Sequence, residues 1–231
     1  MAGLLIGSLY RKYQGLLHEY ATAPDCIIRK DAELTVRRIR YKKQALTDRK
    51  GKDRMHSIYL IGFMGAGKSA VGRELQRSFG MKTVEMDALI EEREQMSISE
   101  IFRVKGEAYF RERETELLGE TGSEEGLAIS CGGGAALREE NVAVMKHHGY
   151  VVYLETRPET VYERVKNSHS RPLLEGNMNI PYITSLIQKR RPFYEKAADI
   201  TVRTDGQSPE EICREIMKEI RKTEGTPGES I

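Results

Sequence analysis

The fold of this chain is decided by the stretch HSIYLIGFMGAGKS, residues 56–69. Its first part, residues 56–61, has the length and composition of a buried strand. Its second part, residues 62–69, matches the pattern G-x-x-x-x-G-K-[ST] in full, and a helical pattern follows over residues 70–79. The order of strand, glycine-rich loop and helix is the one that a phosphate-binding loop requires.

Each residue type in this loop has a physical reason. Glycines let backbone N–H groups turn toward phosphate oxygens without interference from a Cβ atom, and the start of the following helix favours an anion. Lys68 can reach the β- and γ-phosphates, and the Ser69 hydroxyl is suited to bind Mg²⁺ directly. We therefore expect the loop to bind ATP through Gly65, Ala66, Gly67, Lys68, Ser69 and Ala70.

Strands and helices alternate along the rest of the chain. A helix is expected to start after Ser97, which has capping-box spacing to Glu100, and another after Ser208, with Pro209 in its first position. This alternation predicts an α/β fold in which a parallel sheet carries helices on both faces. Further strands are expected over residues 83–86, 127–130, 150–154 and 199–203, and further helices over residues 107–120, 138–148, 158–166 and 180–195.

The sequence also argues against two other classes of P-loop protein, motor ATPases and GTPases. It has no apolar strand that ends in adjacent Asp and Glu, as a motor ATPase needs, and no Asn-Lys-x-Asp guanine signature. One long polar segment, residues 167–179, comes late in the chain and suits a mobile lid. These features favour a small-molecule kinase.

Five further segments are candidates for the acceptor site. In a parallel sheet the carboxyl ends of the strands face the ligand, and alternation along the second strand would send Glu85 and Asp87 to the same side. Arg111 and Glu114 lie three residues apart on a helix, so the carboxylate can orient the guanidinium. The other three segments are the glycines at 132–134, Arg171 within the polar segment, and Arg190-Arg191 near the end of the next helix.

In order and spacing, these segments and the phosphate loop resemble the shikimate kinase family over residues 58–220. The resemblance implies a P-loop kinase fold with a parallel five-stranded sheet. It also implies transfer of a phosphoryl group from ATP, with Mg²⁺, to the 3-hydroxyl of shikimate, a step in aromatic amino-acid biosynthesis. It makes Asp87 the base that binds the shikimate hydroxyls, and it assigns the carboxylate and ring of shikimate to Arg111, Arg190, Gly132, Gly133 and Gly134.

The resemblance assigns further roles on the nucleotide side. Arg171 would be the lid arginine that stabilises the transferred phosphoryl group beside Lys68, Arg164 and Pro209 would sandwich adenine, and Glu114 would support Arg111. One position departs from the family, which usually has Asp where this chain has Glu85. The longer side chain leaves open whether Glu85 keeps the water-mediated contact with Mg²⁺, while Ser69 still offers a direct ligand.

Two other functions stay open on the sequence alone. Another kinase of the same fold, for gluconate or a nucleoside monophosphate, would also use arginines to bind a small anion. A binding protein on a degenerate kinase fold would have lost Lys68, Asp87 or Arg171, and all three are present. We expect a monomer that binds shikimate and ATP, without nucleic acid.

Composition places the chain among globular proteins without a membrane segment. Its hydrophobic and charged fractions, 39% and 31%, are ordinary. No run approaches the roughly 18 apolar residues that span a bilayer, and the first residues lack the features of a secretory signal. Three widely spaced cysteines suit a reducing compartment, so we expect a cytoplasmic protein.

The first 54 residues form a basic extension. They hold thirteen Lys or Arg and six Asp or Glu residues, a net charge of +7 in a chain of +2, and they end in a charged linker over residues 47–54. The extension could be a helical module or a transit peptide, or translation could begin at Met55. We expect residues 55–222 to form the kinase domain and residues 223–231 a disordered tail.

Removal of residues 1–54 should therefore leave the kinase intact. These residues contribute none of the expected site residues, so the stability should change by no more than about 0.5 kcal/mol. Melting curves and phosphorylation rates of the chain starting at Met55, beside the full chain, test this. A large drop in melting temperature or activity would show that the extension packs on the kinase.

Overall fold

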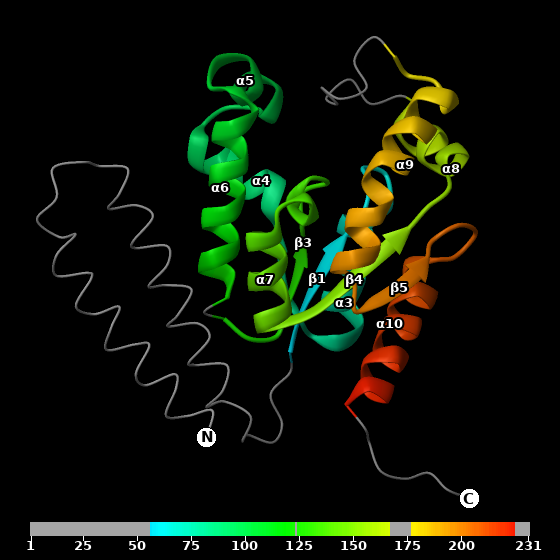
Figure 1. The fold of residues 1–231 in the computed structure, drawn as a ribbon. Coiled ribbons are helices and arrows are strands. Elements are labelled where there is room, and N and C mark those ends of the chain that lie inside the picture. The colour runs from blue at the N-terminus through cyan, green and yellow to red at the C-terminus, as the bar shows by residue number, and fades with distance from the viewer. Residues whose placement is uncertain (1–55, 123, 167–176, 225–231) are drawn as a thin grey trace, which may run out of the picture. The chain divides into compact units, whose positions relative to one another are not determined.

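The computed structural model describes residues 56–122, 124–166 and 177–224. At its centre lies a parallel sheet of five strands in the order β2-β3-β1-β4-β5 (Figure 1). This arrangement confirms the predicted α/β fold and the number of strands. The strands are β1 (Ser57–Ile61), β2 (Lys82–Glu85), β3 (Leu127–Ser130), β4 (Gly149–Glu155) and β5 (Ile200–Arg203).

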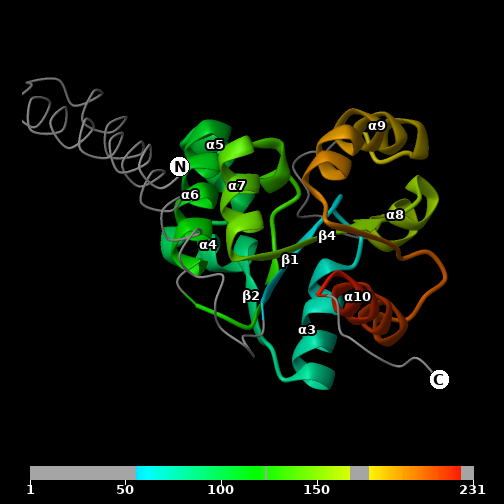
Figure 2. The ribbon, with the colours of Figure 1, turned by 60° about the horizontal axis from the view of Figure 1, so that its bottom comes forward.

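Helices connect the strands and cover both faces of the sheet. Figure 2 shows α3 and α10 on one side of β1 and β4, and α7 and α9 on the other. A short 3₁₀ turn, η1 (Ala135–Leu137), follows β3. The helices are α3 (Lys68–Phe79), α4 (Met86–Glu94), α5 (Ile98–Val104), α6 (Gly106–Thr121), α7 (Glu139–His148), α8 (Pro158–Val165), α9 (Ile180–Ala197) and α10 (Pro209–Thr223).

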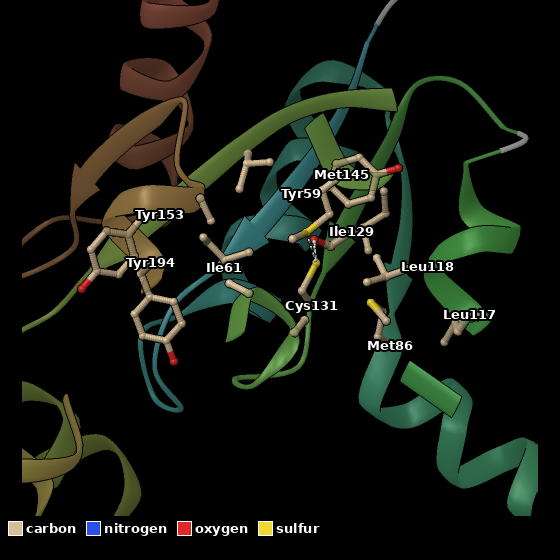
Figure 3. Packing of buried hydrophobic residues seen from close by; sticks show 14 of the residues in the cluster. Tyr59, Ile61, Met86, Leu117, Leu118, Ile129, Cys131, Met145, Tyr153 and Tyr194 are labelled. Atoms are coloured by element: carbon tan, nitrogen blue, oxygen red, sulfur yellow. Dashed lines mark hydrogen bonds between the residues drawn. The ribbon is translucent and has the colours of Figure 1, made fainter. Parts of the chain in front are cut away.

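The central strand β1 contributes to the core on both of its faces. Ile58 and Leu60 belong to the apolar cluster that includes α3 and α10. Tyr59 and Ile61 alternate with them and belong to the cluster that includes α4 to α7 and the end of α9 (Figure 3). All five residues of β1 are buried, as expected for a central strand of a parallel sheet.

Local sequence signals fix several helix ends. The Ser97 hydroxyl accepts a hydrogen bond from the Glu100 amide at 3.2 Å, and Ser208 and Glu211 form a reciprocal capping box at α10. Both helix starts were predicted from the sequence. Within the described residues, no helix combines the length and apolar character that a membrane crossing demands.

One boundary differs from the prediction. The sequence predicts a strand through Met86, with Glu85 and Asp87 on one side by alternation, but β2 ends at Glu85 and α4 begins at Met86. Met86 and Ile90 are both buried while Ala88 between them is exposed; a strand would place all three on one face, whereas a helix separates residue 88 from the other two. Asp87 therefore lies in the first turn of α4, where a carboxylate also interacts favourably with the helix dipole.

Two glycines should respond in opposite ways to alanine. Gly149 faces Ser57 across the β1–β4 pair, and a Cβ there would overlap the Ser57 backbone, so Gly149→Ala should destabilise by about 1–3 kcal/mol. Gly119 lies within α6 with no neighbouring atom in the way, so Gly119→Ala should stabilise by about 0.5–1 kcal/mol. Urea unfolding of both variants checks this; equal effects of one sign would contradict it.

Candidate functional site

The glycine-rich loop between β1 and α3 has backbone conformations that residues other than glycine rarely adopt. Gly62, Gly65 and Gly67 have φ angles of 140°, 77° and 98°. At Gly62 a Cβ atom would also lie 2.7 Å from the Leu154 carbonyl oxygen. The helix α3 has no side-chain cap at its start, so its first amides can bind an anion.

Two side chains at the end of the loop, Lys68 and Ser69, connect it to its surroundings. Lys68 Nζ donates hydrogen bonds to the carbonyl oxygens of Gly62 at 2.9 Å and Phe63 at 3.1 Å. The Ser69 hydroxyl donates to Glu85 Oε2 at 2.8 Å. The end of β2 therefore places a carboxylate directly beside the hydroxyl of the phosphate loop.

Two carboxylates converge over Gly132, just beyond β3. A Cβ atom on Gly132 would lie 2.8 Å from Asp87 Oδ1 and closer still to Glu114 Oε1, so a larger residue here would displace these two carboxylates. Glu114 is completely buried. Burial raises the pKa of Glu114; the nearby Arg111 acts against this shift, and the charge of Asp87 adds to it.

Arg111 lies between two carboxylates and the glycine turn. Its Nη1 donates to Glu114 Oε2 at 2.8 Å, and its Nε and Nη2 donate to Glu107 Oε1 at 3.2 and 2.9 Å. A Cβ atom on Gly134 would overlap the guanidinium. Burial lowers the pKa of Arg111, but the two carboxylates more than offset this, so the pKa lies above its ordinary value.

The middle glycine of the turn, Gly133, connects it to α9 and to the phosphate loop. Arg190 Nη1 donates to the Gly133 carbonyl oxygen at 3.2 Å. A Cβ atom on Gly133 would lie 3.8 Å from the Gly62 carbonyl oxygen and 3.9 Å from the Met64 amide nitrogen. The glycine turn and the phosphate loop therefore lie side by side.

Residues from α8 and the loop after β5 form the other side of the site. Arg164 donates to the carbonyl oxygens of Gly65 at 2.9 Å and Thr204 at 3.4 Å. The loop that begins at Thr204 leads to Pro209, the first residue of α10. The buried hydroxyls of Thr156 and Thr204 lie 2.7 Å apart, which joins the segments that follow β4 and β5.

The structure thus brings most of the expected site residues to the carboxyl edge of the sheet. Arg171 and most of the expected lid lie outside the described residues. Sequence reasoning missed Glu107 and Tyr194, whose hydroxyl donates to the Gly133 carbonyl oxygen at 2.6 Å. Each lies four residues from an expected arginine, Glu107 from Arg111 and Tyr194 from Arg190, and this helical spacing was the available signal.

Comparisons with known proteins agree on one family. The family model for shikimate kinase matches residues 64–221. A shikimate kinase of Dehalococcoides mccartyi is 43% identical over 173 residues, which cover 75% of this chain and 98% of the relative. A shikimate kinase of Persephonella marina is 43% identical over 167 residues, which cover 72% of this chain and all of the relative.

Solved structures give the same result. The shikimate kinase from Acinetobacter baumannii in complex with shikimate superposes with a TM-score of 0.71 at 34% identity, covering 74% of this chain and 96% of that one. The Aquifex aeolicus enzyme has a TM-score of 0.63 at 39% identity and covers 73% of this chain and 98% of its own. The chain belongs to the shikimate kinase family.

Proposed function

We propose that this protein transfers the γ-phosphoryl group of ATP to the 3-hydroxyl of shikimate and releases shikimate 3-phosphate and ADP. The observation that carries the proposal is the position of the Gly132–Gly134 turn, which lies beside the phosphate loop and is flanked by Asp87, Arg111 and Arg190. A donor site and an anion-binding acceptor site thus adjoin at one edge of the sheet. The bound shikimate of the Acinetobacter baumannii relative supports the choice of acceptor.

The phosphate loop binds the triphosphate of ATP in this proposal. The amides of Gly65 to Ala70 surround the phosphate oxygens, and Lys68 leaves the loop carbonyls to pair with the β- and γ-phosphates. The Ser69 hydroxyl would bind Mg²⁺ directly and the Glu85 carboxylate would reach it through water; the two groups lie 2.8 Å apart and offer the oxygen ligands that Mg²⁺ prefers. When bound, Mg²⁺ neutralises charge that develops on the phosphate oxygens.

Asp87 accepts the proton of the acceptor hydroxyl and orients its oxygen toward the γ-phosphate. Arg111 and Arg190 bind the shikimate carboxylate, for which the planar guanidinium is well suited. Glu114 keeps Arg111 in place from its buried side. The Gly132–Gly134 turn brings backbone donors close to the ring.

The remaining assignments complete the nucleotide site. Arg164, held between the phosphate loop and the loop after β5, stacks on adenine opposite Pro209. Arg171 supplies a positive charge to the transferred phosphoryl group from a lid. We further propose a monomeric, cytoplasmic enzyme.

A coupled assay of ADP release tests the proposed function. With ATP and Mg²⁺, shikimate should support turnover, whereas gluconate and nucleoside monophosphates should not. Turnover with another acceptor and none with shikimate would reject the choice of substrate while leaving the kinase assignment in place.

Loss of a group at the reacting phosphate should greatly reduce turnover. Lys68→Ala and Asp87→Asn should each lower kcat by about 10²–10³-fold, because each removes a preorganised charge or hydrogen bond from the transition state. Lys82→Ala, at a lysine that is 80% exposed, serves as the control. Near-normal turnover of Lys68→Ala, with melting curves unchanged, would contradict the phosphate-loop assignment.

Loss of Arg111 should weaken the binding of shikimate and leave the binding of ATP nearly unchanged. Arg111→Ala should raise the KM for shikimate at least tenfold, since a charge-assisted pair with the acceptor carboxylate is lost, and should change the KM for ATP little. Arg113→Ala removes the same charge from the same helix at a residue paired with the exposed Glu116. Equal rises in both KM values would show that Arg111 serves the fold and not the acceptor.

A further inference from the structure

We propose that Tyr194 is a positioning residue of the acceptor site. Its hydroxyl anchors the Gly133 carbonyl, so that Arg190, which shares this carbonyl, can turn to the acceptor carboxylate while the glycine turn keeps its shape. The proposal rests on the proposed function, because it assigns the turn and Arg190 to the acceptor.

Two side chains of α9 donate hydrogen bonds to the same backbone carbonyl, that of Gly133. Its carbonyl oxygen accepts hydrogen bonds from Tyr194 Oη at 2.6 Å and from Arg190 Nη1 at 3.2 Å. Both donors come from α9 and lie four residues apart, hence on the same helix face. A carbonyl oxygen has two lone pairs, so the two hydrogen bonds can coexist, and the shorter one belongs to the tyrosine.

The two donors differ in their freedom to move. Tyr194 is 1% exposed, and its ring stacks on that of Tyr153 with centroids 5.2 Å apart (Figure 3). Arg190 is only half-buried, and its guanidinium, at the end of a long flexible side chain, lies over the Phe63 ring with its carbon 5.7 Å from the ring centroid. Tyr194 is therefore a fixed donor, whereas Arg190 can leave.

The tyrosine also keeps its proton near neutral pH. Burial raises the pKa of Tyr194, and the positive charge of Arg190 and its hydrogen bond to the tyrosine only partly oppose this. The phenol is therefore neutral near neutral pH and keeps the proton that it donates. Gly133 is only half-buried, so the Tyr194 hydroxyl matters as a fixed partner: it keeps the carbonyl in its present direction when Arg190 is engaged elsewhere.

Without the Tyr194 hydroxyl, Arg190 would be needed both by the Gly133 carbonyl and by the acceptor carboxylate. Arg190 would then be the protein donor left on the Gly133 carbonyl, and when it turned to the acceptor the carbonyl would lose its fixed direction. Both effects weaken acceptor binding, while the phosphate loop and the nucleotide contacts of Arg164 are unchanged. A tyrosine that only fills the core would affect stability without this selectivity.

The test compares Tyr194→Phe with Tyr153→Phe. Each variant loses one phenolic hydroxyl from the same stacked pair, but the Tyr153 hydroxyl points to a different side (Figure 3). For Tyr194→Phe we expect the KM for shikimate to rise about three- to tenfold, the effect of one hydrogen bond, with kcat and the KM for ATP changed less than twofold. Tyr153→Phe should leave all three constants within twofold.

A double-mutant cycle with Arg190→Gln asks whether the tyrosine acts through the arginine. In the Arg190→Gln background, Tyr194→Phe should add little further loss in KM for shikimate. Full additivity, an unchanged KM for Tyr194→Phe, or an equal effect of Tyr153→Phe would each overturn the proposal.

Hydrogen exchange of the ligand-free protein separates this proposal from the proposed function. In Tyr194→Phe the amides of residues 133–137 should exchange faster, while those of β1 and β4 should stay protected. This result needs no substrate, so it stands or falls independently of the acceptor's identity. Uniform loss of protection across the sheet would show that the hydroxyl serves general stability and would overturn the positioning role.

Discussion

The hydrogen bonds of β1 to both of its neighbours determine where everything else in the site lies. Leu60 pairs with Ser130 on one side and with Val152 on the other, and the Cys131 amide continues the ladder to the Leu60 carbonyl at 3.0 Å. Because the strands are parallel, the segments that follow them leave the sheet at the same edge. The phosphate loop follows β1 and the glycine turn follows β3, so the pairing of these two strands alone brings the two segments together.

Charged side chains can approach the backbone of the turn at this edge because glycine has no side chain. At Gly132 the vacated space holds two carboxylate oxygens, and at Gly134 it holds the Arg111 guanidinium. Arg111 and Glu114 form a buried ion pair, which adds little net stability because both charges lose their hydration. The pair is better understood as a way to fix the direction of one guanidinium, and the exposed Glu107 restrains it from the solvent side.

The parts of this structure that could be predicted from sequence are those that depend on neighbouring residues. The phosphate loop, the buried strands and the caps at Ser97 and Ser208 follow from local patterns of glycine, apolar residues and cap side chains. The start of α4 could not be predicted this way, because it depends on the burial of Met86 and Ile90 against residues far away in sequence. The four-residue spacing from Arg190 pointed to Tyr194, but its partner could not be predicted, because Gly133 is 61 positions away.

The strand order also has a consequence for how the protein is made. β1 leaves the ribosome before both of its partners, β3 and β4, since these begin at Leu127 and Gly149. At about 5–20 residues per second, its backbone stays without partners for on the order of ten seconds. During that time an apolar strand offers two open edges to other chains. We expect nascent chains that end before β4 to be aggregation-prone and to depend on chaperones, although the finished domain has β1 enclosed at its centre.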